Sequence, residues 1–262
     1  SSLFVIDVEK LYRFFLNSYK AMRGYLRAVG AMGFEPSSVG RKYGGKAARV
    51  ITVFGPKNGA GKSILSSFLG LCCARDAKTI VLDASYTGDS IFNIFEKRIT
   101  TAVSQKDEED LSADSFINER IEAVDDNLSL MNIAFGSKVR VNPDILSPIL
   151  FALSREYRYI VIDLSGRDDA LRDRVFELSD VLFPIVTRPR DRRSLHPLLD
   201  SSLREGQRVL YTLSAYHARS AGGFEGGIIL ENLEIDTKAP VHEMLRSRVD
   251  GENAAEFMEF IR

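Results

Sequence analysis

Cysteine and histidine are scarce in this sequence of 262 residues, and their placement excludes several kinds of site. The two cysteines, Cys72 and Cys73, are adjacent, and adjacent thiols lack the spacing of zinc ligands. They lie in a stretch of small apolar residues, so we expect core packing in a reducing compartment rather than a disulfide. The three histidines, His196, His217 and His242, are scattered and match neither metal-ligand spacing nor a catalytic triad. We expect all three to be structural or surface residues.

Long apolar runs and a large charge of one sign are also missing. No apolar run approaches the ~20 residues that cross a bilayer, and the opening SSLFVIDVEK lacks the basic start of a signal peptide. The chain is 45% hydrophobic and 27% charged, and its net charge of −1 gives no field for coating nucleic acid. We therefore expect a cytoplasmic protein that does not bind DNA or membranes directly. Because the sequence does not begin with Met, we also expect further residues upstream.

Two parts differ in pattern along the chain. Apolar residues at helical spacing predict an amphipathic helix from about Asp7 to Met32, and the linker GFEPSSVGRKYGGK follows it. From Arg49 onward, short apolar segments alternate with helical ones, which is typical of parallel strands buried on both faces. We predict an N-terminal helix and linker at 1–45, either a dimerisation element or the tail of an upstream domain. Residues 46–262 are predicted to form an α/β domain with a doubly wound, mostly parallel sheet.

The predicted strands share short apolar runs: RVITVF, KTIVLD, NLSLMNIA, RYIVID, DVLFPIV and RVLYTLS. A helix is predicted over Lys62–Arg75, and Asn142-Pro143 should open another that ends near Tyr157. The acidic run SQKDEED is interpreted as a solvated loop, and SAGGFEGG (220–227) as a mobile one.

A glycine-rich loop lies between the first predicted strand and its helix, in ITVFGPKNGAGKSILSSFL. This segment nearly matches the phosphate-binding pattern G-x-x-x-x-G-K-[ST]. Gly59 and Gly61 would let backbone N–H groups close around phosphates, and the helix N-terminus adds its positive end. Lys62 is expected to reach the β- and γ-phosphates, and Ser63 to ligate Mg²⁺. Asn58, Ala60 and Ile64 complete the predicted nucleotide contacts.

The run KNGAGKS resembles the deviant Walker A loop K-G-G-x-G-K-[ST] of the MinD/ParA family of ATPases. Lys57 takes the place of that family's signature lysine, which reaches across a nucleotide-sandwich dimer to the partner's phosphates. The resemblance implies a homodimer that forms with ATP and Mg²⁺, and it makes Lys57 a candidate catalytic residue. The alternative is that Lys57 is an exposed loop lysine with no role.

The resemblance extends over about Lys46–Arg262. YIVIDLSG is similar to the family's Walker B strand, in which Asp163 would hold magnesium through water. IVLDASYTGDS places Asp83, a second candidate metal residue, at a strand end, with Asp89 in a G-D element. These segments resemble the CpaE/TadZ branch, whose members are pilus-assembly and polar-localisation relatives of MinD. Three further segments do so as well: VNPDILSPILFALSREY, SDVLFPIVTRPRDRR and IDTKAPVHEMLRSRVDG.

Several residues depart from the family pattern. Pro56 holds the place of the first glycine of the general phosphate-binding pattern and removes one backbone donor. Asn58 replaces the family's first glycine after the signature lysine, and because Asn tolerates left-handed backbone, the loop can still form. Ser85 holds the position of the carboxylate that positions the attacking water in hydrolysing relatives, and a serine cannot accept a proton as a carboxylate does. Asp89 is the remaining candidate there. Ser214 stands where relatives often present an asparagine to adenine. We expect nucleotide binding with slow or absent hydrolysis, and the base specificity stays open.

Two further segments have alternative interpretations. RPRDRRSL places Arg188, Arg190, Arg192 and Arg193 after a strand, either for an anionic ligand or partner or as a solvated helix start. The terminal ENAAEFMEFIR gathers apolar residues on one side but carries Glu252, Glu256 and Glu259. Because acidic faces are repelled by anionic lipid, we predict packing against the core rather than membrane anchoring.

The leading hypothesis is a MinD/ParA-like switch that dimerises with ATP to localise or regulate a protein assembly whose identity stays open. The alternative is a degenerate P-loop scaffold that serves as an interaction module without nucleotide. A metabolic phosphotransferase is disfavoured, because the sequence shows no second-substrate motif.

Overall fold

The computed structural model describes residues 42–43, 46–56, 59–84, 90–98, 117, 120–133, 143, 146–164, 169–187, 193, 195, 199, 203–214, 227–230 and 239–262. All of them belong to one compact unit, Arg41–Arg262. The helix predicted from Asp7 to Met32 and the boundary predicted at residue 45 lie outside the described residues, so both stay predictions.

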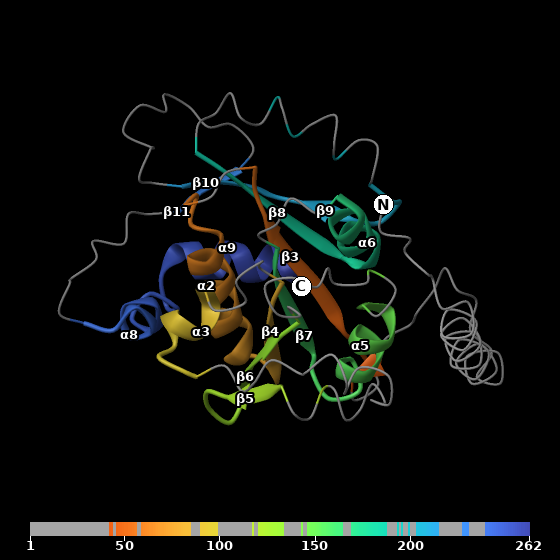
Figure 1. The fold of residues 1–262 in the computed structure, drawn as a ribbon. Helices are drawn as coiled ribbons and strands as arrows, with labels where there is room; N and C mark the ends of the chain where they lie inside the picture. The colour runs from red at the N-terminus through yellow and green to blue at the C-terminus, as the bar shows by residue number, and fades with distance from the viewer. Residues whose placement is uncertain are drawn as a thin grey trace, which may run out of the picture. The chain divides into compact units, whose positions relative to one another are not determined.

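One large sheet organises this unit (Figure 1). Within the described residues it has nine strands, in the order β11-β10-β8-β3-β7-β4-β6-β5, and β9 pairs with β8. Their bounds are β3 Arg49–Phe54, β4 Thr79–Asp83, β5 Ile121–Ala123, β6 Leu128–Asn132, β7 Tyr159–Leu164, β8 Val181–Val186, β9 Arg208–Val209, β10 Tyr211–Ser214 and β11 Gly227–Leu230. All neighbours are parallel except β5, which runs antiparallel to β6. Before β3, β1 (Lys42–Tyr43) and β2 (Lys46–Ala47) form a separate antiparallel pair.

Helices cover both faces of the sheet (Figure 1). Their bounds are α2 Lys62–Ala74, α3 Ser90–Ile94, α5 Leu146–Leu153, α6 Asp169–Leu178, α8 Val241–Arg246 and α9 Glu252–Ile261. One apolar core joins α2, α3, α8 and α9 to the strands, and a second joins α5 and α6 to the opposite face. Neighbouring residues of a strand therefore enter different cores: Val53 enters the first and Phe54 the second. The predicted doubly wound, mostly parallel α/β fold is confirmed.

Most predicted elements are confirmed to within one or two residues at the ends. Four strands were missed. The short strands β1 and β2 lie in and at the end of the predicted linker, β5 has no fully buried residue, and β11 begins inside the glycine-rich run interpreted as a mobile loop. Both predicted ends of the helix from Pro143 to about Tyr157 are wrong in detail, because Pro143 lies in a 3₁₀ turn and α5 spans only Leu146–Leu153. The loops at 104–110 and 220–226 lie outside the described residues.

The C-terminal helix α9 packs against the core, as the sequence predicts. Phe257 is fully buried, with its ring centroid 5.4 Å from that of Phe183 on β8 and 6.2 Å from that of Phe68 on α2. The predicted apolar set Ala254, Phe257, Met258 and Ile261 is buried throughout. Cys72 and Cys73 are free thiols buried in the same core, which confirms their packing role. Among the helices that the structure describes, none has both the length and the apolar character to cross a membrane.

Helix α2 lies unusually close to the sheet at Gly70. A Cβ atom at this position would come within 2.5 Å of Cγ2 of Val81 on β4, a distance that real Cβ contacts do not show. Val81 is fully buried and β-branched, so its side chain has little freedom to move aside. The absence of a side chain at Gly70 therefore sets how closely α2 approaches β4.

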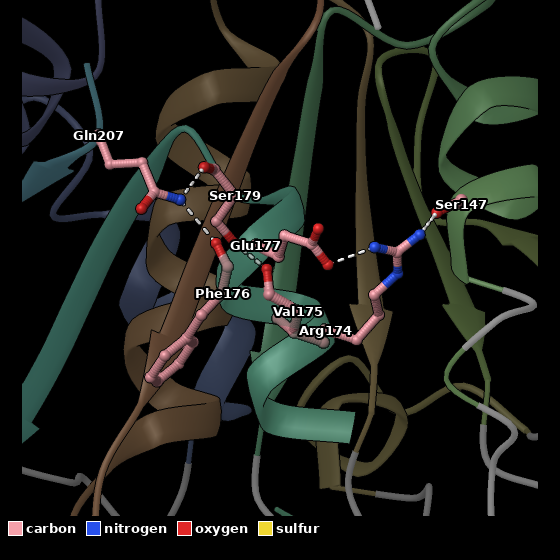
Figure 2. Close-up of polar contacts among 7 residues, drawn as sticks. All are labelled: Ser147, Arg174, Val175, Phe176, Glu177, Ser179 and Gln207. Carbon is pink, nitrogen blue, oxygen red and sulfur yellow. Dashed lines mark hydrogen bonds and ion pairs between the residues drawn. The ribbon is translucent and has the colours of Figure 1, made fainter. Parts of the chain in front are cut away.

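The C-terminal end of α6 is held by side chains from outside the helix (Figure 2). Nε2 of Gln207 donates to the carbonyl oxygens of Phe176 at 2.6 Å and Ser179 at 2.8 Å. The Ser179 hydroxyl donates to the carbonyl of Val175 at 2.6 Å and lies 2.7 Å from the hydroxyl of Thr52 on β3. Carbonyl groups that the helix leaves without intrahelical donors are thereby satisfied.

Helix α6 is also linked to α5 through Arg174 (Figure 2). Nη2 of Arg174 donates to the Ser147 hydroxyl on α5 at 2.6 Å, and Nη1 forms an ion pair with Glu177. Since α6 is the helix that follows β7, these contacts fix the element directly after the strand that carries Asp163.

Candidate functional site

Among the described residues of the loop between β3 and α2, two glycines have the positive φ angles that tight turns around anions use. Gly59 has φ 72° and Gly61 has φ 91°, both in the left-handed region that other residues rarely adopt. Gly61 is the N-cap of α2, and its carbonyl accepts the N–H of Leu65 at 2.9 Å. Among the described residues, no side chain caps this end and no acidic residue lies in the first turn. The first-turn N–H groups thus face a position suited to an anion.

The Ser63 hydroxyl at the start of α2 contacts a carboxylate of the sheet. Its Oγ donates to Oδ2 of Asp163 at 2.7 Å, and the hydroxyl of Ser66, one turn further along α2, donates to Oδ1 at 3.3 Å. Asp163 is fully buried near the C-terminal end of β7. Burial raises the pKa of Asp163 to about 7, opposed by the Ser63 hydrogen bond. The strand and the helix therefore meet at one carboxylate.

A second carboxylate lies beside the first. Asp83 on β4 is the register partner of Asp163 on β7, and it is also fully buried. Its Oδ2 accepts the backbone N–H of Ile91, in the first turn of α3, at 3.2 Å. The negative charge of Asp83 is a further cause of the raised pKa of Asp163. Two adjacent buried carboxylates therefore concentrate negative charge at the C-terminal ends of the central strands β4 and β7, near the start of α2.

Lys62 supplies positive charge beside these carboxylates. The residue is only 6% exposed, and its burial lowers the pKa of the ammonium group, an effect that the charge of Asp163 opposes. A lysine that is shielded from water interacts strongly with an anion placed beside it.

The oxygen groups present fit a magnesium ion that shares its coordination with a phosphate. The hydroxyl of Ser63 and the carboxylates of Asp163 and Asp83 are hard oxygen donors of the kind that Mg²⁺ prefers. Within the described residues, no group of three or more His, Cys, Asp or Glu could hold a metal ion by itself. Magnesium commonly binds through one or two protein oxygens together with phosphate oxygens and water, which matches this donor set.

The structure brings together a large part of the predicted site. Gly59, Ala60 and Gly61 form the loop, and the next three residues, Lys62, Ser63 and Ile64, begin α2. The side chain of Ile64 packs against the core, so only its backbone faces the loop. The candidate metal residues Asp83 and Asp163 lie side by side as register partners on the adjacent strands β4 and β7.

The other predicted residues lie outside the described part of the chain: Lys57, Asn58, Ser85 and Asp89. Of the basic run after β8, the structure describes Arg193, which is exposed. Ser66 was not predicted to belong to the site. Its spacing of three residues from Ser63 on a helix was the available signal, because residues so spaced share a face.

The strand order, with β3 between β7 and β8, and the glycine loop that leads from β3 into α2 define the fold of P-loop nucleoside triphosphatases. No protein-family model matches the chain, and no curated protein sequence is significantly similar to it. Solved structures do resemble it, and they are MinD/ParA P-loop ATPases.

Three of these structures illustrate the likeness. The MinD of the MinC:MinD cell division complex of Aquifex aeolicus is 17% identical, with a TM-score of 0.57 over 81% of this chain and 96% of that chain. The ParA family ATPase of Chlorobium tepidum is 16% identical, with a TM-score of 0.56 over 77% and 97%. The septum site-determining MinD of Pyrococcus horikoshii, complexed with Mg-ADP, is 16% identical, with a TM-score of 0.53 over 80% and 98%. At these identities, the comparison establishes the fold.

Proposed function

We propose that the chain binds ATP with Mg²⁺ at the β3–α2 loop and works as a nucleotide-dependent switch for a protein assembly. The observation that carries this proposal is the meeting of Ser63 and Asp163 at 2.7 Å beside the buried Lys62, at the open N-terminus of α2. A phosphate at this helix end would meet backbone N–H groups, a lysine and a metal-binding hydroxyl together. The Mg-ADP in the Pyrococcus horikoshii MinD structure supports the choice of ligand.

Each residue of the site has a role in this proposal. The first-turn N–H groups and Lys62 bind and orient the phosphates, and Ser63 and Asp163 hold magnesium, with Asp83 completing the acidic edge. The ion would neutralise charge on the phosphates. Lys57 would reach the nucleotide of a second copy, so that binding favours a homodimer. Because Ser85 stands in place of a water-positioning carboxylate, we expect hydrolysis to be slow or absent, with Lys57 and Asp89 as candidate catalytic residues.

The partner is proposed to be a protein, by analogy with the MinD that is found in complex with MinC. The resemblance of several segments to the CpaE/TadZ branch favours an assembly or localisation machinery as the target. A cytoplasmic site of action fits two free buried thiols, which persist in reducing compartments.

Calorimetric titration with ATPγS and MgCl₂ tests nucleotide binding. We expect saturable binding by the wild type and a loss of at least about tenfold in affinity for Lys62→Ala, because a charge beside the phosphates is removed. Lys78→Ala is the matched control: Lys78 is exposed and lies at the opposite end of β4, where it pairs with Glu156. Its affinity should equal that of the wild type.

Light-scattering mass with and without nucleotide tests the switch. We expect the mass to double with ATPγS and Mg²⁺, and Lys57→Ala to bind nucleotide but remain at the monomer mass. No heat and no change in mass at millimolar nucleotide would contradict ATP binding. That result would favour the alternative of a scaffold that acts through protein contacts alone.

A further inference from the structure

The carboxylate of Asp163 is held at both of its oxygens by the same helix. Oδ2 accepts the hydroxyl of Ser63 at 2.7 Å, and Oδ1 accepts the hydroxyl of Ser66 at 3.3 Å. The two serines are three residues apart on α2, so both face β7. One face of the helix therefore presents two donors to one carboxylate.

A single hydrogen bond would leave this carboxylate free to turn. The terminal torsion of an aspartate is broad and roughly two-fold, so one donor does not fix which way the second oxygen points. Two donors on different oxygens do fix it. The constraint matters here because Asp83, the register partner of Asp163, is a like charge that favours rotation away from it.

The next residue of the helix provides an internal comparison. Ser67 is fully buried like Ser66, but its hydroxyl has no hydrogen-bond partner among the described residues. Two adjacent serines of one helix are thus equally shielded from water, and only one of them contacts the site. Burial alone therefore does not produce such a contact, although burying a hydroxyl without a partner is unfavourable.

We infer that Ser66 is a positioning residue for the magnesium site: by holding Oδ1 of Asp163, it keeps Oδ2 directed at Ser63. The inference rests on the proposed binding of ATP with Mg²⁺. In this account Ser66 touches neither the metal nor the nucleotide, and it acts only through the hydrogen bond that its hydroxyl donates to Oδ1 of Asp163. Groups that orient a metal-binding side chain in this way commonly change metal affinity by about 10-fold or more when they are removed.

The test compares Ser66→Ala with Ser67→Ala, using the full chain and a fixed ATPγS concentration that leaves the site mostly empty without Mg²⁺. MgCl₂ is titrated, and the half-saturating Mg²⁺ concentration is measured from the change in bound nucleotide. The melting temperature of each nucleotide-free protein is measured in parallel, because a merely structural role would appear there. We expect the half-saturating Mg²⁺ concentration to rise about 10-fold in Ser66→Ala and to stay within about twofold in Ser67→Ala.

The outcomes separate the inference from the function on which it rests. If the wild type binds ATPγS with Mg²⁺ but the two variants have equal half-saturating Mg²⁺ concentrations, the role of Ser66 is refuted and the proposed function stands. A lower melting temperature of Ser66→Ala with unchanged Mg²⁺ dependence refutes it as well. If the wild type binds no ATPγS, the proposed function fails, and the role of Ser66 fails with it.

Discussion

At the scale of single residues, the dominant feature is a buried carboxylate that the fold does not neutralise completely. Asp163 is fully buried beside Asp83, and burial raises its pKa to about 7 from an ordinary value of 3.8. The hydroxyls of Ser63 and Ser66 oppose this shift but do not cancel it. The buried charge of Asp163 therefore carries a stability cost in the nucleotide-free protein.

Asp163→Asn should stabilise the nucleotide-free protein at pH 8. The folded pKa of Asp163 lies above its unfolded value, so the native state holds the extra proton between pH ~4 and ~7. The free energy of unfolding of the wild type then falls as pH rises through this window. Asparagine has no charge to bury, so we expect a gain of about 1–2 kcal/mol at pH 8 and a smaller gain at pH 5. Urea unfolding at both pH values measures the difference.

Asp126→Asn is the control for this prediction. Asp126 is an exposed carboxylate in the turn between β5 and β6, and its replacement should change the free energy of unfolding by less than about 0.5 kcal/mol at either pH. If Asp163→Asn lowers the free energy of unfolding at pH 8, or raises it equally at both pH values, the buried charge of Asp163 does not destabilise the protein.

The sequence predicted the residues of the site whose chemistry is tied to their spacing. Lys62 and Ser63 follow a glycine loop between a strand and a helix, and Asp163 ends an apolar strand. Ser66 could not be predicted with the same security, because its role depends on which face of α2 meets β7. The contact of Asp83 with the N-terminus of α3 depends likewise on tertiary packing.

At the scale of elements, α6 is held at its C-terminal end by a side chain from another part of the chain. Gln207 precedes β9 and donates through Nε2 to the carbonyl oxygens of Phe176 and Ser179 (Figure 2). Its Oε1 accepts the N–H of Arg204 at 2.7 Å. One amide group thus uses both its donor and its acceptor, and it connects the helix end to the turn before β9.

Gln207→Glu should destabilise the fold by about 1–3 kcal/mol, although the two side chains have nearly the same shape. The carboxylate can still accept from Arg204, but it cannot donate to the two carbonyl oxygens and would repel them. Gln207→Ala removes the same donors without adding a charge, so its effect should be smaller than that of glutamate. Chemical denaturation of the three proteins measures both differences, and a Gln207→Glu variant as stable as the wild type would contradict the role of the amide.

The elements that the sequence revealed are those buried on both faces. The strands β3, β7 and β8 are rich in apolar residues, and these residues enter one or the other of the two cores. The edge strands β5 and β11 lack this signal: the first is only partly buried, and the second follows a run of glycines. Their pairing is decided by the sheet rather than by their own composition.

At the scale of the whole molecule, burial in the core determines how reactive the two thiols are toward reagents in solution. Burial raises the pKa of Cys72 to about 12 and that of Cys73 well above its ordinary value. Since the thiolate is the reactive form, both cysteines should be nearly inert in the native protein at pH 8.

Labelling with a chromogenic disulfide reagent should therefore report unfolding. We expect native labelling to be at least about 100-fold slower than in denaturant, where both thiols react. Cys72→Ala leaves Cys73 as the single reporter, and it should show the same protection. Rapid labelling of one thiol in the native wild type would show that the groove formed by α2, α9 and the turn before α9, which Cys72 lines, admits the reagent.

Gly70 has a consequence for how such a site is inherited. The residue lies one helical turn beyond Ser66 and two beyond Ser63, outside the phosphate-binding motif. A side chain there would push α2 away from Val81 and lift both serines from Asp163. A descendant sequence could therefore keep every residue of the phosphate loop intact and still lose the site through one mutation elsewhere in the helix. The presence of every motif residue in a related sequence therefore does not by itself show that the Ser63–Asp163 contact is kept.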